Sequence, residues 1–283
     1  MTASYDVLER DIERFAATPA GELLPDDAEA AIEAVLNALE SGTLRAARRA
    51  PDGAWDAVPW VKKAILLAFR ISPTVAMTGF AGAGFVDKQT MPPRLLTPED
   101  GVRLVPGGSA VRRGAHLAKG VVCMPPMYVN VGAWVGAGTM IDSHALVGSC
   151  AQVGARVHLS AAAQIGGVLE PVNAAPVVVE DDVMIGGNCG VYEGTVVRRG
   201  AVLGAGVILT RGTPVYDLVR ETVYRGSAEH VLEIPENAVV VPGARQVSGD
   251  WARGQGLALQ TPVIVKYRDE KTDVATTLEQ WLR

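Results

Sequence analysis

Asp142 and His144 are residues whose types and spacing suggest proton transfer. Asp142 directly follows an aliphatic residue, Ile141, and His144 comes two residues later. A carboxylate can orient an amine and accept its proton, and an imidazole exchanges protons near neutral pH. Taken alone, each has a plainer alternative, because a turn carboxylate often caps local amide groups and a corner histidine is often only solvated.

Two arginines are candidates for binding anionic groups. Arg103 precedes the repetitive part of the chain, at a domain junction where a guanidinium would hold a carboxylate through two parallel hydrogen bonds. Arg211 follows in the later part of the repeats, where it would contact the phosphates of a ligand. The alternatives are a surface ion pair for Arg103 and a solvated charged face for Arg211.

The element that must position these residues is a six-residue repeat. Every sixth residue from Val111 to Ile165 is aliphatic or Cys, and the residue two places earlier is usually small. The same period continues from Val179 to Val215, with a partial turn near residues 234–241. One inward aliphatic residue in each six predicts a parallel β-helix of about six coils. The period itself does not determine the handedness of that helix.

The flanking segments differ from the repeats. Leu169 to Pro176 interrupts the period and is predicted to be an inserted loop. The first hundred residues predict three helices and a small hairpin around Pro51-Asp52-Gly53, with loops at residues 79–84 and 91–93. The end of the chain predicts a strand over Pro262–Tyr267 and a helix over Asp273–Leu282. We therefore expect domains at residues 1–105, 106–247 and 248–283.

Composition limits the possible partners and compartments. The net charge of −5 does not indicate binding to nucleic acid or to an anionic membrane. The first residues do not resemble a signal peptide, and no apolar stretch is long enough to span a membrane. The three cysteines form no C-x-x-C pair and predict free thiols in a reducing cytoplasm, which pack or sit in turns rather than act as nucleophiles.

Two other classes of β-helix protein are alternatives at this point. A structural rod or protein-binding surface would need no catalytic groups, but the large flanking segments argue against it. Trimeric β-helix carbonic anhydrases bind zinc through three histidines. His116 and His158 raise this alternative, although they lack tight ligand spacing, and no metal site is predicted.

Several segments of the chain resemble the tetrahydrodipicolinate N-succinyltransferase family. The helical front end together with the Gly-Gly-Val-Leu-Glu-Pro loop is more specific to that family than the six-residue repeat. The matching segments, spread over nearly the whole chain, are Trp60–Ile71, Phe85–Lys88, Tyr128–Ala133, Gly138–Asp142, Val147–Gln152, Val157–Ser160, Ile165–Pro171 and Pro262–Lys266.

The resemblance implies a left-handed β-helix and a homotrimer with active sites between neighbouring subunits. It implies transfer of succinyl from succinyl-CoA to the amine of L-tetrahydrodipicolinate, in lysine and diaminopimelate biosynthesis, without a metal or prosthetic group. Arg103 matches the family arginine that binds a substrate carboxylate, and Asp142 matches the aspartate that contacts the substrate nitrogen. The residues expected to contact CoA are Gly186, Gly206 and Arg211.

The chain departs from the family pattern at two places. Gly190 occupies the position where many members of the family have a glutamate that assists catalysis, and His144 replaces a tryptophan. We therefore expect Asp142 and His144 to be the catalytic pair, with direct attack and no acyl-enzyme. The main alternative is an acetyl-CoA-dependent transferase acting on a similar amino-dicarboxylate. A generic hexapeptide transferase acting on a sugar or serine fits the front end less well.

Overall fold

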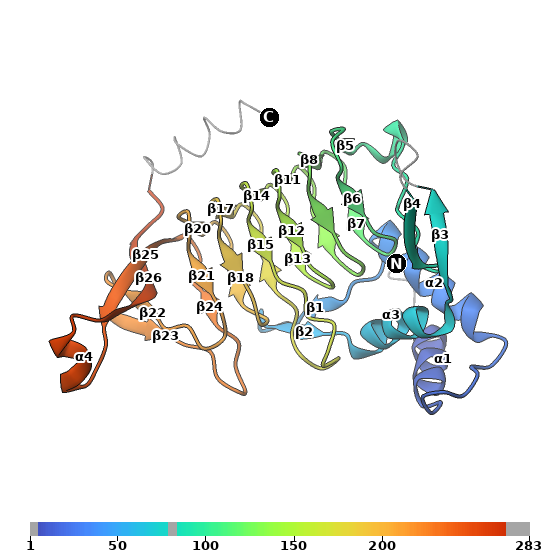
Figure 1. The fold of residues 1–283 in the computed structure, drawn as a ribbon, viewed down its shortest axis with the longest axis horizontal. Helices are drawn as coiled ribbons and strands as arrows, with labels where there is room; N and C mark the ends of the chain where they lie inside the picture. Colours follow the sequence, from blue (N-terminus) through green and yellow to red (C-terminus); the bar gives the residue numbers. More distant parts are fainter. Residues whose placement is uncertain (1–4, 79–83, 270–283) are drawn as a thin grey trace.

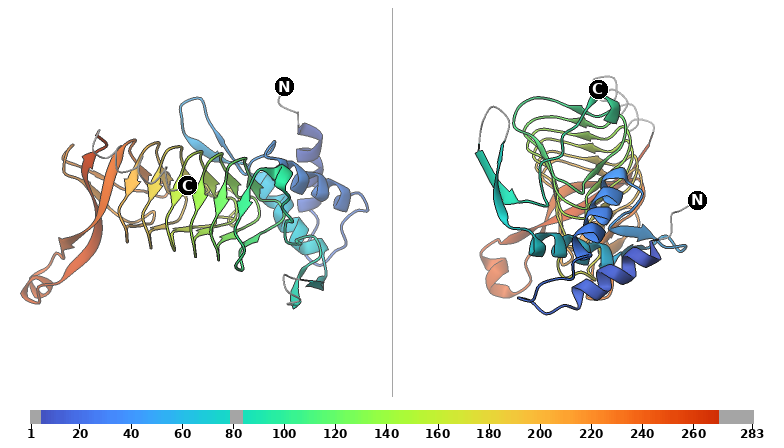
Figure 2. Two further views of the ribbon diagram at one scale, coloured as in Figure 1. Left: turned by 90° about the horizontal axis from the view of Figure 1, so that it is seen from above. Right: turned by 90° about the vertical axis from the view of Figure 1, so that its right-hand side faces the viewer.

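The protein is an elongated three-sided prism, a left-handed parallel β-helix with helices at one end and long strands at the other (Figure 1 and Figure 2). The computed structural model describes residues 5–78 and 84–269. Two-residue strands alternate with corners, so each six-residue repeat forms one side of a coil. The predicted fold class is confirmed.

Three faces, here called A, B and C, form the prism. Face A contains β5 (Arg103–Leu104), β8 (Val122–Cys123), β11 (Met140–Ile141), β14 (His158–Leu159), β17 (Met184–Ile185) and β20 (Val202–Leu203). Face B contains β6 (Ala110–Val111), β9 (Tyr128–Val129), β12 (Leu146–Val147), β15 (Gln164–Ile165), β18 (Gly190–Val191) and β21 (Ile208–Leu209). Face C contains β7 (His116–Leu117), β10 (Trp134–Val135), β13 (Gln152–Val153), β16 (Val178–Val179), β19 (Val196–Val197) and β24 (Glu233–Ile234).

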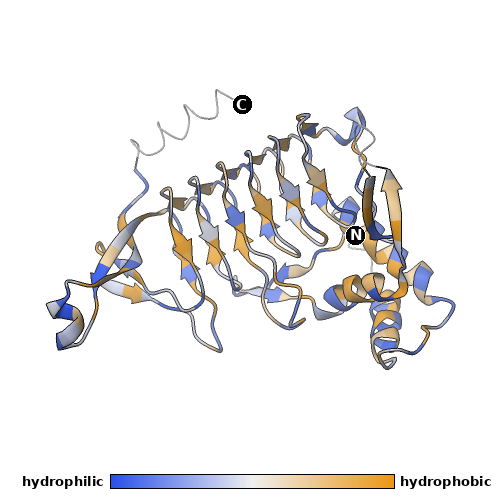
Figure 3. Ribbon diagram, viewed as in Figure 1, coloured by the Kyte–Doolittle hydropathy of each residue, from blue (hydrophilic) through white to orange (hydrophobic). Residues whose placement is uncertain are grey.

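The second residue of each of these strands points inward, and from Val111 to Leu209 these are the residues that the period singled out. Ile141, for example, stacks between Cys123 and Leu159, and all three are fully buried. The small residues two places earlier, such as Ala145, are also buried. Figure 3 shows hydrophobic residues on strands along the length of the prism. Burial of this aliphatic stack is what stabilises the coils.

The chain leaves the period at two places rather than one. Val179 follows Ile165 by fourteen residues instead of six, and no strand lies between β15 and β16, so the predicted insertion is confirmed. The prediction that Val215 continues the repeats is wrong. It begins β22 (Val215–Asp217), which forms an antiparallel pair with β23 (Thr222–Tyr224), while β24 continues face C.

The N-terminal region contains the predicted helices α1 (Asp6–Ala16), α2 (Ala28–Ser41) and α3 (Pro59–Ile71). The predicted hairpin forms β1 (Ala47–Arg49) and β2 (Trp55–Ala57). A second hairpin, β3 (Thr74–Thr78) with β4 (Gly84–Lys88), was not predicted. The loop expected over residues 79–84 falls on it: Gly84 is already strand, and residues 79–83 lie outside the described residues.

The helices and the first hairpin pack onto the β-helix. The helices share a core with Val131 and Cys150, which lie at the edge between faces B and C. The hairpin lies over face C, where Arg45 stacks on the ring of Trp134 at 3.9 Å from its centroid. The outward residues of face C are consequently buried in its middle, as at Gln152. Those of face A, such as Met140, remain partly exposed.

At the other end, β25 (Ala238–Gln246) and β26 (Ala258–Tyr267) form a long antiparallel pair that extends face A. The predicted strand lies within β26, and a short helix, α4 (Asp250–Gly254), connects the pair. The helix expected over Asp273–Leu282 lies outside the described residues. Within the part of the chain that the structure describes, no helix is long and apolar enough to cross a membrane.

Candidate active site

Asp142 lies where β11 turns from face A to face B, at what we call the AB edge. Its backbone amide donates to the carbonyl of Leu159 at 2.9 Å, which ties it to the next coil. Its Oδ1 accepts the backbone N–H of Ser143 at 2.7 Å. No described residue donates to Oδ2. One carboxylate oxygen is therefore held by the corner while the other is available to a ligand.

His144 lies on the same corner in a left-handed backbone conformation, with φ of 62°. Its carbonyl accepts from Gln164 Nε2 at 3.1 Å, and its amide donates to the carbonyl of Pro126. The left-handed region is uncommon outside glycine, although histidine is enriched there. The hydrogen bonds to neighbouring coils hold that conformation and leave the imidazole exposed.

Arg103 lies on face A, two strands before Asp142's strand. It is the outward, exposed residue of β5 and stands in register with Val122, which stands in register with Met140. Two strand spacings separate Arg103 from Met140, or about 10 Å. Asp142 is two residues farther along β11. Arg103 and Asp142 therefore lie on the same side of the prism, on coils two strand spacings apart.

Gly186 and Gly206 lie on the AB edge, farther along the prism than Asp142. The positions of Asp142, Ser160 and Gly186 follow one another from coil to coil, linked by backbone hydrogen bonds across the strands. A Cβ on Gly186 would lie 2.6 Å from the backbone nitrogen of Ala205, so no larger residue fits there. Gly206 adopts φ of 80° in the column of His144. Beyond Asp142 the edge is thus a track of small residues.

A backbone amide at a Gly-rich corner was expected from the sequence to support an oxyanion, but its position was not, and three amides on this track are candidates. The N–H groups of Ala161, Gly187 and Ala205 donate to no described residue, whereas their corner neighbours bond from coil to coil. Successive coils are about 4.8 Å apart, so these donors form a ladder along the AB edge. Each coil has three corners, so every third corner along the chain lies on the AB edge. The recurrence of small residues at these corners is the sequence signal that would have located the ladder. Such a ladder can bind the carbonyl oxygens of an extended ligand.

Arg211 does not lie on the AB edge with Gly186 and Gly206. It follows β21 at the edge between faces B and C, the BC edge, where its backbone N–H donates to Glu193 Oε2 at 3.0 Å. It lines a recess of about 660 Å³ together with Tyr192, Glu170 and residues of the inserted loop. Between Gly206 and Arg211 the chain crosses the whole of face B. Within one subunit, Arg211 therefore lies on a different edge from Gly186 and Gly206.

Gly190 stands at the position that the resemblance matches to a family glutamate. The outward space beside it on face B is filled by Tyr192. A Cβ on Gly190 would lie 2.9 Å from the hydroxyl oxygen of Tyr192 and closer still to a ring carbon. Tyr192 was not among the predicted site residues. A glycine at an outward strand position followed two residues later by a tyrosine is the signal that would have identified it.

The cysteines are unsuited to nucleophilic catalysis. All three are buried and form no disulfide. Burial raises the pKa of the Cys150 thiol to about 12, and the same cause raises that of Cys123 to about 12. Burial also raises the pKa of Cys189. Because the thiolate is the reactive form, these thiols are almost wholly protonated at neutral pH.

The histidines considered as zinc ligands lie on different faces. His116 is on face C, where its ring stacks on Trp134 and its Nδ1 lies 2.8 Å from the carbonyl oxygen of Glu40. His158 is on face A. Among residues 5–78 and 84–269, no three His, Cys, Asp or Glu side chains are grouped so that they could hold a metal ion. His116 is thus committed to packing against α2.

Two family models match parts of the chain. A family model described as tetrahydrodipicolinate N-succinyltransferase N-terminal matches residues 10–71, and one described as hexapeptide repeat of succinyl-transferase matches residues 176–211. Among solved structures, a putative 2,3,4,5-tetrahydropyridine-2-carboxylate N-succinyltransferase from Campylobacter jejuni has a TM-score of 0.46 and 20% identity, covering 83% of this chain and 62% of that one.

Relatives with known names match at much higher identity. A 2,3,4,5-tetrahydropyridine-2,6-dicarboxylate N-succinyltransferase from Rhodopseudomonas palustris is 43% identical over 261 residues, which cover 89% of each chain. A protein of the same name from Polynucleobacter asymbioticus is 42% identical over 267 residues, covering 93% of this chain and 92% of that one. On this similarity, which extends through both the helical region and the β-helix, the chain belongs to the tetrahydrodipicolinate N-succinyltransferase family.

Proposed function

We propose that the protein transfers succinyl from succinyl-CoA to the amine of ring-opened L-tetrahydrodipicolinate, giving N-succinyl-2-amino-6-oxopimelate. The observation that carries this proposal is the placement of Asp142 and Arg103 on one side of the prism, in a chain of this family. The acceptor has an amine and two carboxylates. It therefore needs a proton acceptor and a cation on the same side of the protein, which Asp142 and Arg103 supply.

The reaction proceeds by direct attack of the amine on the thioester. Arg103 holds a carboxylate of the acceptor while Asp142 orients the nitrogen through its open oxygen, Oδ2. As the new C–N bond forms, the carbonyl electron pair moves onto oxygen and Asp142 accepts the proton from nitrogen. The intermediate then collapses and expels the CoA thiolate, which takes up the proton that Asp142 accepted and leaves as the thiol. The buried, protonated cysteines support a route without an acyl-enzyme.

The donor lies along the AB edge beyond Asp142. Small residues leave room there for an extended chain, and the amides of Ala161, Gly187 and Ala205 offer hydrogen bonds to its carbonyl groups. One of these amides supports the developing oxyanion. Because Arg211 lies on the BC edge, it reaches the same donor only if that donor is bound between two subunits.

The active unit is a homotrimer in this proposal, and its compartment is the cytoplasm, in keeping with three unpaired thiols. Face A supports the trimer, because four of its six outward residues, Val122, Met140, Met184 and Val202, are apolar and partly exposed. Apolar residues in such a row are typical of a surface covered by another subunit.

Size-exclusion chromatography with light scattering tests the homotrimer. It should give about three times the monomer mass of 29.7 kDa, and a monomer would contradict this assignment.

A thiol-release assay tests the reaction. The wild-type protein is mixed with L-tetrahydrodipicolinate and either succinyl-CoA or acetyl-CoA. We expect release to be faster with succinyl-CoA and to require the acceptor. Faster release with acetyl-CoA would assign the protein to acetyl transfer instead, and no release with either donor would contradict the proposal as a whole.

Asp142→Asn tests the catalytic assignment within the same assay. Asparagine keeps the oxygen that accepts from Ser143 but cannot take a proton, so kcat should fall by about 100-fold or more. Asp56→Asn, the same change at an exposed position of the first hairpin, is the matched control and should retain full activity. Near-wild-type turnover of Asp142→Asn would show that another group accepts the proton.

A further inference from the structure

Face B has a gap in its outward row at Gly190. In the neighbouring strands the same outward position carries a side chain, Gln164 on one side and Ile208 on the other. Gly190 contributes none, yet the residue is buried. Some other group therefore covers this part of face B.

The covering group is the ring of Tyr192. It comes from the BC edge and folds back over face B, where two glycines make room for it. A Cβ on Gly166 would lie 2.8 Å from Tyr192 Cδ1, and one on Gly190 would lie 2.9 Å from both Cζ and the hydroxyl oxygen. The two glycines form a slot that holds the ring and brings its hydroxyl to Gly190.

The hydroxyl so placed is available to a ligand. Tyr192 is only partly buried, and among the described residues its hydroxyl has no hydrogen-bond partner. Gly190 belongs to the same coil as Gly186 and Gly187, which lie three to four residues earlier on the AB edge. Its strand neighbour Gln164 donates to the carbonyl of His144. The hydroxyl therefore lies on face B in the coil of Gly186 and Gly187, two coils beyond that of Asp142.

We propose that the Tyr192 hydroxyl is a further catalytic group, a hydrogen-bond donor to the oxyanion that develops on the thioester carbonyl. This inference rests on the proposed function. The phenol donates a hydrogen bond and transfers no proton: the C–N bond forms, the electron pair moves onto oxygen, and the thiolate later leaves as that pair returns. A fixed neutral donor at this position stabilises the charged intermediate more than the ground-state carbonyl.

Tyr192→Phe tests the role, because phenylalanine keeps the ring in the glycine slot and removes only the hydroxyl. We expect kcat for succinyl transfer to fall by about 100-fold, the loss typical of one oxyanion donor. KM for succinyl-CoA and the melting temperature should stay close to wild type. Tyr216→Phe, the same change in β22 outside the coils, is the matched control.

Gly190→Ala provides an independent test, because its Cβ would displace the ring while the tyrosine is retained. The loss should resemble that of Tyr192→Phe, and the double variant should be no worse than either single one, since both remove the same contact. Wild-type kcat for Tyr192→Phe would overturn the inference, as would multiplicative losses in the double variant. If the wild-type protein itself released no thiol, the proposed function would fail first.

Discussion

At the scale of single residues, the AB edge places a carboxylate and an imidazole on one corner. Asp142 keeps one oxygen open, and His144 leaves its imidazole exposed two residues later. The corner holds both through backbone hydrogen bonds to the adjacent coils, so their positions depend little on their own side-chain contacts. This makes each side chain replaceable without loss of the fold.

His144→Ala should lower kcat by at least about tenfold if the imidazole exchanges protons with the substrate. The melting temperature should change little, because the ring is exposed and the backbone contacts to Pro126 and Gln164 remain. Steady-state kinetics with succinyl-CoA and a thermal melt would measure both quantities. Unchanged turnover would remove His144 from the mechanism and leave Asp142 to act without it.

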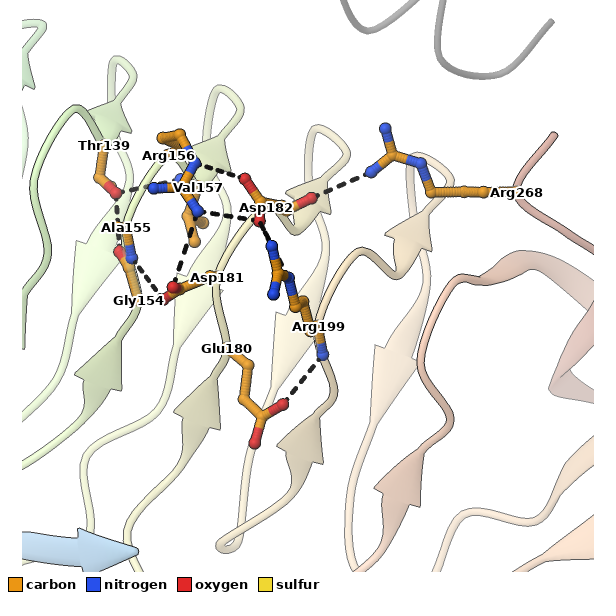
Figure 4. A network of polar contacts seen from close by, with 10 residues as sticks. All are labelled: Thr139, Gly154, Ala155, Arg156, Val157, Glu180, Asp181, Asp182, Arg199 and Arg268. Carbon is orange, nitrogen blue, oxygen red and sulfur yellow. Dashed lines mark hydrogen bonds and ion pairs between the residues drawn. The ribbon is translucent and has the colours of Figure 1, made fainter. Parts of the chain in front are cut away.

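At the scale of elements, the edge between faces C and A is held by a ladder of charged side chains (Figure 4). Arg156 donates to both carboxylate oxygens of Asp182, at 2.6 and 2.9 Å, and Arg199 donates to Oδ2 at 3.1 Å. The three residues come from successive coils. The ladder therefore links neighbouring coils at their corners, where the two-residue strands offer few hydrogen bonds.

Asp182→Asn should destabilise the protein by roughly 0.5–1 kcal/mol at pH 7, since Arg156 and Arg199 are largely exposed. The hydrogen bond from Arg156 lowers the pKa of Asp182. A lowered pKa stabilises the fold above the unfolded value of about 3.9, and this contribution disappears as the pH falls through the folded-state pKa. Melting curves of variant and wild type should accordingly begin to converge as the pH falls below about 4, and should coincide only below the lowered folded-state pKa. A constant difference down to pH 2 would contradict the assignment.

At the scale of the whole molecule, the prism is a stack of coils that each bury one aliphatic residue per side. Leu209 and Ile208 in β21 illustrate the arrangement: Leu209 is fully buried and the adjacent Ile208 is 37% exposed. Each coil contacts mainly its two neighbours, so a defect in one coil weakens the stack locally.

Leu209→Ala should lower the free energy of unfolding by about 2–5 kcal/mol, because it leaves a cavity between coils. Ile208→Ala, one residue away, removes a similar side chain from the outer surface and should cost well under half as much. Urea unfolding of both variants followed by circular dichroism would compare them. Equal losses would mean that the inward register at β21 is wrong or that Ile208 is covered in the assembled protein.

Much of this arrangement follows from local pattern. The inward stack, the inserted loop and the first three helices were all predictable, because an inward position accepts only apolar residues and a helix has its own period. The placement of Asp142 at an outward corner followed from the six-residue period, because Asp142 directly follows the inward Ile141. The β3–β4 hairpin and the departure at Val215 were missed, since both depend on pairing between strands whose sequences resemble loops or repeats.

The sequence by itself therefore determined the β-helix, its aliphatic interior and the outward position of Asp142, because each depends on a period within the chain. The tertiary structure alone decided that Arg211 is separated from Gly186 by a face and that Tyr192 covers Gly190. It also showed that the AB-edge amides of Ala161, Gly187 and Ala205 donate to no described residue. These features arise where residues from different coils or edges meet, and contacts of that kind leave no repeat in the sequence.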